Sequence, residues 1–300
     1  MTAPAPAAFL DPRHLAGIGD LALLARTVVD GFLHGLHRSS RMGLSLDFAE
    51  HRPYQPGDDL RRIDWRVYGR TDRYYLKTYE ADTNADVVFA LDASGSMDFT
   101  TGALTKFDYA RFLVACLAWL SQRQGDRVGL VTIAEDREES VPPSTRHLQL
   151  ILHTLGRTRP GGGGRLVPSL ERIARLRTRA GIVVLVSDCY EDPAALRKAL
   201  GGLRARGQDV ILFHVLDPAE RDLPADAPGT FEDAETGMRM PLRPEQLREK
   251  YRALVEAHQA ELRRGAAQAN LDFVPVDTHR PLDGALRSFL DYRLMGSRAR

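Results

Sequence analysis

The chain has 300 residues, and 41 Lys and Arg residues against 40 Asp and Glu residues give it a formal net charge of +1. This balance excludes a uniformly basic nucleic-acid binder and a highly charged disordered protein. The hydrophobic fraction of 43% and the charged fraction of 27% are ordinary for a globular protein. The length is sufficient for one large domain or two smaller ones.

The first 83 residues form a distinct N-terminal segment. Residues 1–11 begin with an Ala/Pro-rich stretch and are predicted to be disordered. Within residues 12–83, apolar residues at helical spacing predict a helix over 12–37. Residues 44–79 then carry the strand-like pieces SLDF, DWRVYG and YYLKTY around the turn-forming PGDD.

The remainder, residues 84–300, alternates between strand and helix patterns. Short, β-branched apolar runs typical of strands buried on both faces lie at 87–91, 128–133, 182–186, 210–215 and 273–276. Helical patterns lie at 107–122, 147–155, 166–176, 194–206, 244–268 and 282–294. This alternation predicts an α/β fold with a doubly wound, mostly parallel sheet. An insertion at 221–242 is predicted to be a hairpin that turns at Thr236 and Gly237.

The cysteines and the apolar stretches indicate a compartment. Cys116 and Cys189 are the only cysteines and form no CxxC, so neither a disulfide framework nor a zinc site is expected. We interpret Cys189 as a buried thiol rather than a nucleophile, because no base accompanies it. The N-terminus lacks a signal-peptide pattern, and the longest uncharged apolar stretch, 112–120, is far below the roughly 18–20 residues of a membrane span. These features predict a cytoplasmic protein without a membrane span.

Oxygen-bearing side chains follow two of the predicted strands. The first strand ends in Asp92-Ala93-Ser94-Gly95-Ser96, and Ser187-Asp188 follows the run at 182–186. Ligands of doubly wound sheets bind beyond the carboxyl ends of the strands, and Mg²⁺ or Mn²⁺ prefers oxygen ligands. We therefore predict a metal site formed by Asp92, Ser94, Ser96 and Asp188. The alternative is structural: the serines cap a turn and a helix while Asp92 accepts hydrogen bonds from backbone amides.

This D-x-S-x-S arrangement resembles the metal-ion-dependent adhesion site of the von Willebrand factor type A domain. The resemblance implies a threonine ligand on a glycine-rich loop, where this sequence has Gly164 followed by Arg165. Thr158 is the one substitute nearby, so weak metal binding is expected. We interpret the glycines at 161–164 as a flexible loop rather than a phosphate-binding loop, because no Gly-Lys-Ser/Thr follows them.

A dense charged motif, R-x-Y-x-x-G-D-D-x-R-x-I-D-W, precedes the sheet region. Its residues are Arg52, Tyr54, Gly57, Asp58, Asp59, Arg61, Asp64 and Trp65. Bidentate arginine–carboxylate pairs could lock this segment onto the sheet domain. A catalytic role is the less favoured alternative, because charged clusters more often form ion-pair networks.

The motif also carries a resemblance to a bacterial family. The stretch GLHRSSRMGLSLDFAEHRPYQPGDDLRRIDWRVYGRTDRYYLKTYEADTN, followed by LDASGSM, VSDCYED, ILFHVLDPAE, FEDAETG and LDYRL, resembles the domain of unknown function family 58 over residues 30–295. The resemblance implies a partnership with a MoxR-type AAA+ ATPase in chaperone-like assembly or maturation. It implies no catalytic residue.

Three classes of function compete on this sequence. The favoured hypothesis is a non-catalytic, metal-assisted protein-interaction module. The alternative is a Mg²⁺-dependent phosphohydrolase centred on Asp92 and Asp188, but Ser94 stands where a general acid/base carboxylate would be needed. Nucleic-acid binding by residues 157–179, which hold seven Arg against Glu171, is not expected, because a solvated helix face explains them. Residues 217–239 carry seven acids against two Arg, and such a polarised chain suits docking to a protein.

Overall fold

A six-stranded sheet organises the molecule. The computed structural model describes residues 15, 17–38, 50–53, 67–69, 73–78, 85–135, 138–177, 179–221, 229–232, 237–242 and 244–298. The strands of the sheet are β3 (Asp86–Asp92), β4 (Arg127–Ile133), β5 (Glu139–Ser144), β6 (Gly181–Ser187), β7 (Gln208–Leu216) and β10 (Asp272–Asp277). Their spatial order is β10-β7-β6-β3-β4-β5. All neighbouring pairs are parallel except β4 and β5. This order is that of a doubly wound sheet, so the predicted fold class is confirmed.

The five strands expected from apolar runs are all present, and β5 is the strand that the sequence did not reveal. Its sequence, ESVPPS, is neither alternating nor rich in apolar residues. Proline cannot donate to a strand ladder, and prolines within sheets are therefore found at edges. β5 accordingly lies at the edge, and its register with β4 shifts between Val128 and Leu130.

The helices follow the predicted ranges closely. They are α4 (Lys106–Arg123), α5 (Leu148–Arg157), α6 (Leu166–Leu176), α7 (Pro193–Ala205), α8 (Pro244–Gln268) and α9 (Asp283–Arg298). Side-chain caps set two of the starts: Thr105 accepts the Asp108 N–H before α4, and Asp192 accepts the Ala195 N–H before α7. Two short 3₁₀ helices, η3 (Gly95–Asp98) and η4 (Pro218–Arg221), follow β3 and β7.

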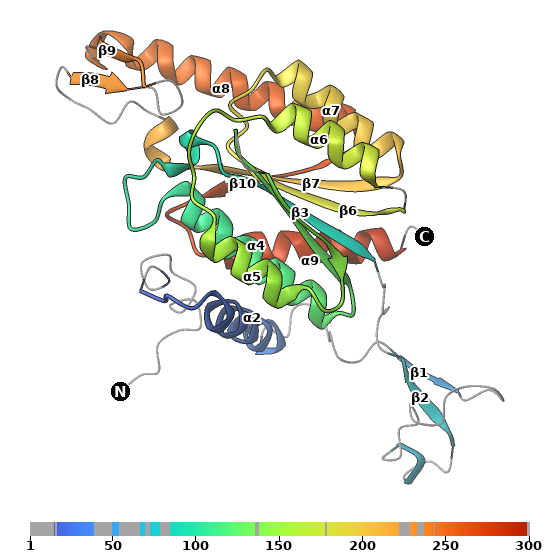
Figure 1. The fold of residues 1–300 in the computed structure, drawn as a ribbon. Helices are drawn as coiled ribbons and strands as arrows, with labels where there is room; N and C mark the ends of the chain where they lie inside the picture. Colours follow the sequence, from blue (N-terminus) through green and yellow to red (C-terminus); the bar gives the residue numbers. More distant parts are fainter. Residues whose placement is uncertain are drawn as a thin grey trace.

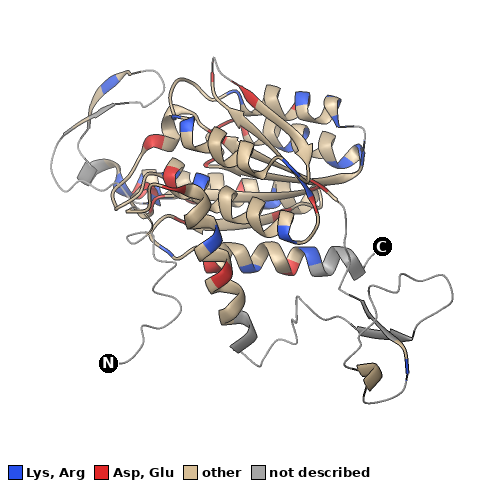
Figure 2. Cartoon of the chain, turned by 60° about the horizontal axis from the view of Figure 1, so that its bottom comes forward, with Lys and Arg blue, Asp and Glu red and all other residues tan. Residues whose placement is uncertain are grey.

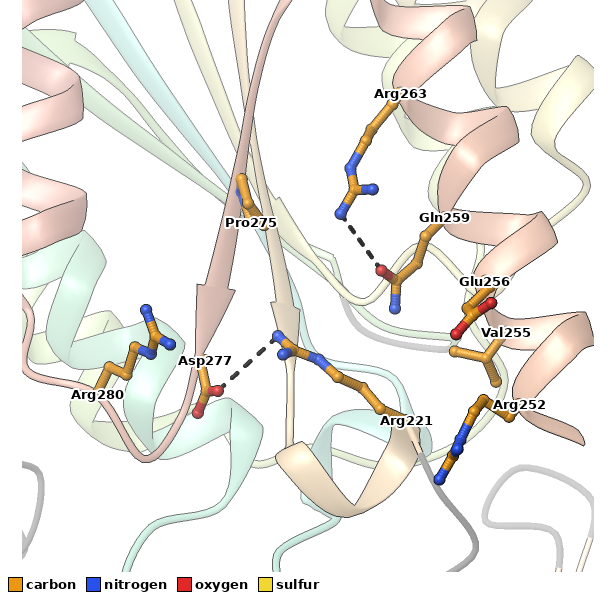
Figure 3. Close-up of a pocket in the computed structure, with 9 residues that line it drawn as sticks. All are labelled: Arg221, Arg252, Val255, Glu256, Gln259, Arg263, Pro275, Asp277 and Arg280. Carbon is orange, nitrogen blue, oxygen red and sulfur yellow. Dashed lines mark hydrogen bonds and ion pairs between the residues drawn. The ribbon is translucent and has the colours of Figure 1, made fainter. Parts of the chain in front are cut away.

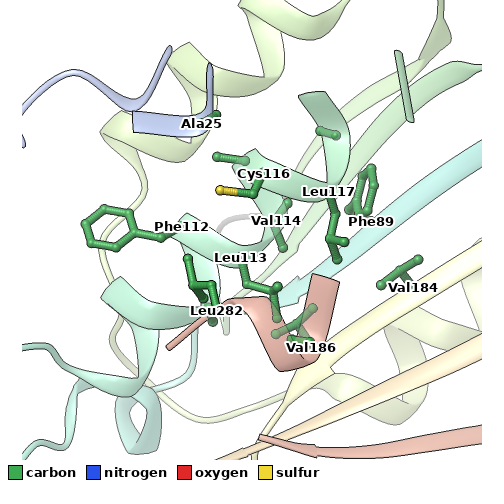
Figure 4. Close-up of a cluster of buried hydrophobic side chains, with 14 of the residues drawn as sticks. Ala25, Phe89, Phe112, Leu113, Val114, Cys116, Leu117, Val184, Val186 and Leu282 are labelled. Carbon is green, nitrogen blue, oxygen red and sulfur yellow. The ribbon is translucent and has the colours of Figure 1, made fainter. Parts of the chain in front are cut away.

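The helices form two layers, one on each face of the sheet (Figure 1). α4, α5 and α9 bury one apolar cluster against the sheet together with α2 (Leu21–Arg38). Figure 4 shows the centre of this cluster, where Leu113 and Leu117 of α4 meet Phe89, Val184 and Val186 of the strands. α6, α7 and α8 bury a second cluster on the opposite face. The strands are thus covered on both faces, as their continuous apolar runs predicted.

The helix predicted over 12–37 is interrupted. Leu15 is helical, residues 17–20 are not, and α2 begins after Asp20, which accepts hydrogen bonds from the N–H groups of Ala22 and Leu23. Figure 1 shows α2 beside α4, and buried Ala25 and Phe112 belong to the same apolar cluster. The helix therefore belongs to the sheet domain. The expectation of disorder for residues 1–11 lies outside the described residues.

Two small two-stranded antiparallel sheets complete the described chain. β1 (Glu50–Pro53) pairs antiparallel with β2 (Tyr75–Thr78), and β8 (Gly229–Glu232) pairs with β9 (Arg239–Leu242). The antiparallel pairing of β8 with β9 agrees with the hairpin predicted in the 221–242 insertion. Of its predicted turn, Gly237 has a positive φ of 68°, and Thr236 lies outside the described residues. The strand-like interpretation of DWRVYG is wrong for residues 67–69, which form a helical turn.

Charge excesses along the sequence are offset by contacts in space. Arginines of the 157–179 segment pair with acids from elsewhere: Arg157 with Glu139, Arg172 with Glu138, and Arg177 with Asp86. Figure 2 shows Lys and Arg (blue) and Asp and Glu (red) distributed over the described helices and loops. Three of the seven arginines of this segment are thus engaged in ion pairs with acids from other parts of the chain.

The tight pairing of β3 with β6 predicts a difference between two glycine substitutions. In Gly181→Ala, the added Cβ would lie 2.4 Å from the backbone oxygen of Asp86, so the strands must separate. We expect the free energy of unfolding to fall by about 1–3 kcal/mol, as in other overpacked sites. In the control Gly201→Ala, nothing lies within 4 Å of the added Cβ, and α7 should gain about 0.5–1 kcal/mol. Urea denaturation of both variants measures the difference.

Candidate functional site

The candidate site lies where the strand order reverses. The first strand of the sheet along the chain, β3, has β4 on one side and β6 on the other, and this is the topological switch point at which doubly wound sheets bind ligands. In the parallel register Leu91 pairs with Val186, so both strands end at the same level. The loop after each strand begins there, and Asp92 and Asp188 are brought together as predicted.

Asp92 is buried and held by neutral donors. Its Oδ1 accepts the backbone N–H of Ser94 at 2.9 Å, and its Oδ2 accepts the hydroxyl of Ser187 at 2.6 Å. The Ser94 and Ser96 hydroxyl oxygens lie 3.1 Å apart. The backbone contact agrees with the structural alternative for Asp92. The capping role is not observed for Ser94, which precedes η3 but makes no side-chain capping hydrogen bond.

The environment of Asp92 resists ionisation. The pKa of Asp92 is raised to about 6, first by burial and second by the nearby charge of Asp188. The hydrogen bonds from Ser187 and Ser94 act in the opposite direction but do not cancel the effect. At neutral pH, Asp92 therefore carries a buried negative charge, and both of the groups that donate hydrogen bonds to it are neutral.

Asp188, in contrast, has a cation as its partner. The side chain of Lys106, at the start of α4, is fully buried, and its Nζ lies 2.7 Å from Asp188 Oδ2 and 2.5 Å from Glu220 Oε1. The ammonium group also lies 5.0 Å from the ring centroid of Tyr190. Burial lowers the pKa of Lys106, but the two carboxylates raise it by more, so the net shift is upward and the lysine is charged.

The charge balance of this buried group follows from these contacts. Three carboxylates, Asp92, Asp188 and Glu220, belong to this group, and the ammonium of Lys106 contacts two of them, Asp188 and Glu220. The sequence did not identify Lys106, Glu220, Ser187 or Tyr190 as site residues. One signal was available for Lys106, because the chain has only four lysines and this one opens a helix whose next turns are apolar. Nothing in the sequence indicated Glu220, which reaches the site from η4.

The glycine-rich loop is pinned to the site rather than flexible. Gly162 O accepts the Gly95 N–H at 2.8 Å, and Gly161 N–H donates to Ala93 O at 3.0 Å. Gly162 has a φ of 69°, and a Cβ there would lie 2.7 Å from Glu135 Oε2. Glycine thus permits the close approach of the Glu135 side chain, and two backbone hydrogen bonds hold the loop that the sequence predicted to be flexible. Thr158 donates its hydroxyl to Thr154 O at 2.9 Å, at the end of α5.

The loop after β6 is rigid and enclosed. Cys189 has a φ of 57°, and its N–H donates to Ser187 Oγ at 2.9 Å. His214 Nε2 lies 2.9 Å from the backbone oxygen of Asp188, and His258 Nε2 lies 3.1 Å from that of Cys189. Both cysteines are buried with free thiols, and burial raises the pKa of Cys189, so the interpretation of a buried thiol agrees with the structure.

The oxygen atoms around Asp92 are suited to a hard cation. Asp92, Ser94, Ser96 and Asp188 can supply two carboxylates and two hydroxyls, a donor set that Mg²⁺ accepts. No group of three or more His, Cys, Asp or Glu side chains in the described part of the chain could hold a metal. Any metal here would therefore depend on the serine hydroxyls, and it would compete with Lys106 for Asp188.

Most of the charged motif before the sheet cannot be placed. Arg52 lies in β1, paired opposite Leu76 of β2. The other motif residues lie outside the described residues: Tyr54, Gly57, Asp58, Asp59, Arg61, Asp64 and Trp65. Their predicted role as an ion-pair network stays a prediction.

The raised pKa of Asp92 predicts a pH-dependent gain from Asp92→Asn. Because the folded pKa, about 6, exceeds the ordinary value of 3.8, the contribution of Asp92 to stability is present below pH 4 and lost as the pH rises through 6. Asparagine cannot ionise and still accepts the Ser94 N–H. With EDTA present, we expect the variant to be about 2 kcal/mol more stable than the wild type at pH 8.

The same comparison near pH 4 should show no such gain. Asp98→Asn, which changes an exposed carboxylate of the same loop, is the control and should have little effect at either pH. Urea denaturation at the two pH values measures all three proteins. An Asp92→Asn variant less stable than the wild type at pH 8 would show that the charge of Asp92 is compensated.

Solved structures with related folds have low sequence identity to this chain. The conserved hypothetical protein BatB from Bacteroides thetaiotaomicron matches with 16% identity and a TM-score of 0.49, covering 72% of this chain and all of its own (100%). The SpRpn10 VWA domain matches with 12% identity and a TM-score of 0.42, covering 67% of this chain and 93% of its own. The fold class therefore depends on the strand order observed here.

No helix in the described part of the chain is long and apolar enough to span a membrane.

Sequence relatives cover nearly the whole chain. Uncharacterized protein Rv1480 of Mycobacterium tuberculosis (strain ATCC 25618 / H37Rv) is 30% identical over 297 residues, which are 96% of this chain and 92% of the relative. Uncharacterized protein Mb1516 of Mycobacterium bovis matches to the same extent. The model of the family "Protein of unknown function DUF58" matches residues 50–261. The chain belongs to the DUF58 family.

Proposed function

We propose that this protein is a non-catalytic interaction module that binds a protein partner through a divalent cation at the carboxyl edge of its sheet. The observation that carries the proposal is the uncompensated carboxylate of Asp92, buried beside Asp188 at the switch point. A buried charge is costly unless it is paired or coordinates a metal. A divalent cation supplies the missing charge.

Mg²⁺ or Mn²⁺ would be held by Asp92, Ser94, Ser96 and Asp188. Hydroxyl ligands add no charge, so the bound cation would stay electrophilic toward an acidic side chain of the partner. Gly164, in the place of the usual threonine, supplies no side-chain oxygen. Weak binding of the metal by the protein alone fits this donor set.

Lys106 limits the affinity of the proposed metal. Its ammonium occupies Asp188 Oδ2, so a cation that uses Asp188 must share it with, or displace, a positive charge already in place. Two cations close together in a buried site repel strongly because screening there is weak. Lys106 therefore keeps the fold stable without metal and makes tight binding conditional on a partner that adds a ligand.

The partner that we propose is a MoxR-type AAA+ ATPase, in chaperone-like assembly or maturation. Support comes from the resemblance of the motif blocks and from membership of the DUF58 family. We place the protein in the cytoplasm, where Cys116 and Cys189 would stay reduced. All of the proposed roles are in binding, and none requires a catalytic residue.

Metal titration tests the site directly. We expect calorimetry to show Mn²⁺ binding to the wild type at millimolar metal and none to Asp92→Ala. The double variant Lys106→Met/Glu220→Gln removes the competing ammonium and also removes the charge of Glu220, which that ammonium neutralises. It should bind Mn²⁺ about tenfold more tightly than the wild type does. Lys198→Met changes an exposed lysine of α7 and should match the wild type. Equal binding by Asp92→Ala and the wild type would refute the proposed site.

The stability of Lys106→Met alone provides a second measurement. This variant leaves Asp188 and Glu220 buried without their cation, and breaking a buried ion pair costs about 3–5 kcal/mol. We expect a loss of this size in urea denaturation. Glu220→Gln in the same chain should recover part of the loss, because it removes one uncompensated charge. If Glu220→Gln recovered none of the lost stability, Lys106 would not be neutralising Glu220 as well as Asp188.

Affinity capture tests the partner. A tagged wild type recovered from its native host should co-purify with an AAA+ ATPase when ATP and Mg²⁺ are present. We expect the yield of ATPase to fall with EDTA or with Asp92→Ala, because the cation would bridge the two proteins. Mass spectrometry of the captured proteins identifies the partner. An ATPase yield that neither EDTA nor Asp92→Ala lowers would show that the ATPase does not bind through the proposed metal site.

A further inference from the structure

A second feature of the carboxyl edge is a cavity of about 530 Å³ beside β10 (Figure 3). Charged side chains from three regions line it. We call the following six residues the arginine pocket: Arg221 of η4, Arg252, Glu256 and Arg263 of α8, Asp277 at the end of β10, and Arg280 after it. In Figure 3, the α8 residues face Asp277 and Arg280 across the cavity, with Arg221 between them.

The arginine pocket has an excess of positive charge. Four arginines and two acidic residues line the cavity, a formal sum of +2 over these six side chains, and Arg252 makes a further interaction of its own. Asp277 is already engaged, because its Oδ2 lies 3.8 Å from Arg221 and its Oδ1 accepts the His279 N–H at 2.9 Å. Arg263 is held in place by a 3.5 Å hydrogen bond to Gln259 and by the Phe273 ring, whose centroid lies 5.8 Å away.

The 3₁₀ helix η4 links the arginine pocket to the buried Lys106 beside the candidate metal site. Glu220 extends from this short helix to Lys106, while the next residue, Arg221, lines the pocket. The Tyr251 hydroxyl donates to Glu220 O at 2.9 Å and so ties η4 to α8. A partner that contacts one of these sites at the carboxyl edge is therefore close to the other.

An apolar cavity adjoins the arginine pocket. It has a volume of about 230 Å³ and shares Val255 and Gln259 of α8 with the larger cavity. The other side chains around it include Tyr190, His214, Tyr251, Leu254 and His258. A ligand along this surface of α8 would thus meet basic groups first and apolar groups next to them.

This arrangement suits an acidic peptide better than a phosphate group. Phosphate sites commonly use backbone N–H groups at a helix N-terminus, whereas the pocket lies along the interior of α8, which begins at Pro244. Its guanidinium groups alternate with Glu256 and Asp277, which favours spaced carboxylates over one concentrated charge. Strand addition to the edge strand β10 is also disfavoured, because Pro275 lacks the N–H that a new strand would need.

We infer that the arginine pocket binds an acidic segment of a protein partner, with an apolar side chain of that segment in the adjoining cavity. This inference rests on the proposed function as an interaction module. It does not require the metal, because the guanidinium groups alone bind carboxylates. The partner would approach the carboxyl edge with several acidic residues.

A labelled peptide tests the inference. The probe is an end-blocked, fluorescent Glu-Glu-Leu-Glu-Glu peptide, and Gln-Gln-Leu-Gln-Gln is its neutral match. In low salt with EDTA, fluorescence anisotropy should show about tenfold tighter binding of the acidic peptide, because only it pairs with guanidinium groups. Arg263→Gln should remove most of this difference. Arg264→Gln, which changes the adjacent exposed arginine outside the pocket, should leave it intact.

Three results would overturn the inference. They are equal binding of the acidic and neutral peptides, equal loss of binding in Arg263→Gln and Arg264→Gln, and displacement of the acidic peptide by inorganic pyrophosphate far more readily than by unlabelled peptide. The last result would assign the pocket to a phosphate ligand. Because EDTA is present throughout, failure here is distinct from failure of Mn²⁺ binding at Asp92.

Discussion

The parallel pairing of β3 with β6 is the constraint on which the candidate site depends. Both strands are buried along their whole length. Because Leu91 aligns with Val186, the carboxyl ends of β3 and β6 lie at the same level of the sheet. The sheet runs outward in opposite directions from these strands, so they mark the topological switch point. Asp92 and Asp188 meet there because backbone pairing fixes the positions from which they extend.

Bringing two carboxylates into a buried place has an electrostatic cost, and the structure offsets it unequally. Asp188 receives the ammonium of Lys106, which Glu220 and the ring of Tyr190 also contact. Asp92 receives only neutral hydrogen bonds, and its pKa is raised accordingly. The site is thus partly neutralised by its own chain, and the charge of Asp92 is not. The proposed cation site rests on this imbalance.

The elements that follow the sheet join this site to a wider surface. η4 contributes Glu220 to the buried lysine and Arg221 to the arginine pocket, and α8 lines both the pocket and its apolar neighbour. An acidic residue suits both places, as a ligand of a cation near Asp92 and as a partner of the guanidinium groups. Both features of the carboxyl edge therefore favour the same class of partner, a protein with an acidic docking segment.

The sequence by itself determined the fold class, most element bounds and the proximity of Asp92 to Asp188, because apolar periodicity and strand-end position are local signals. It missed the break at residues 17–20 in the predicted N-terminal helix, after which Asp20 caps α2, and it missed the proline-bearing β5. Only the tertiary structure revealed the buried Lys106, the contribution of Glu220 and the pinned Gly162, since these contacts join residues far apart in the chain. Burial and charge compensation depend on such contacts, and they decide whether a motif can function as a site.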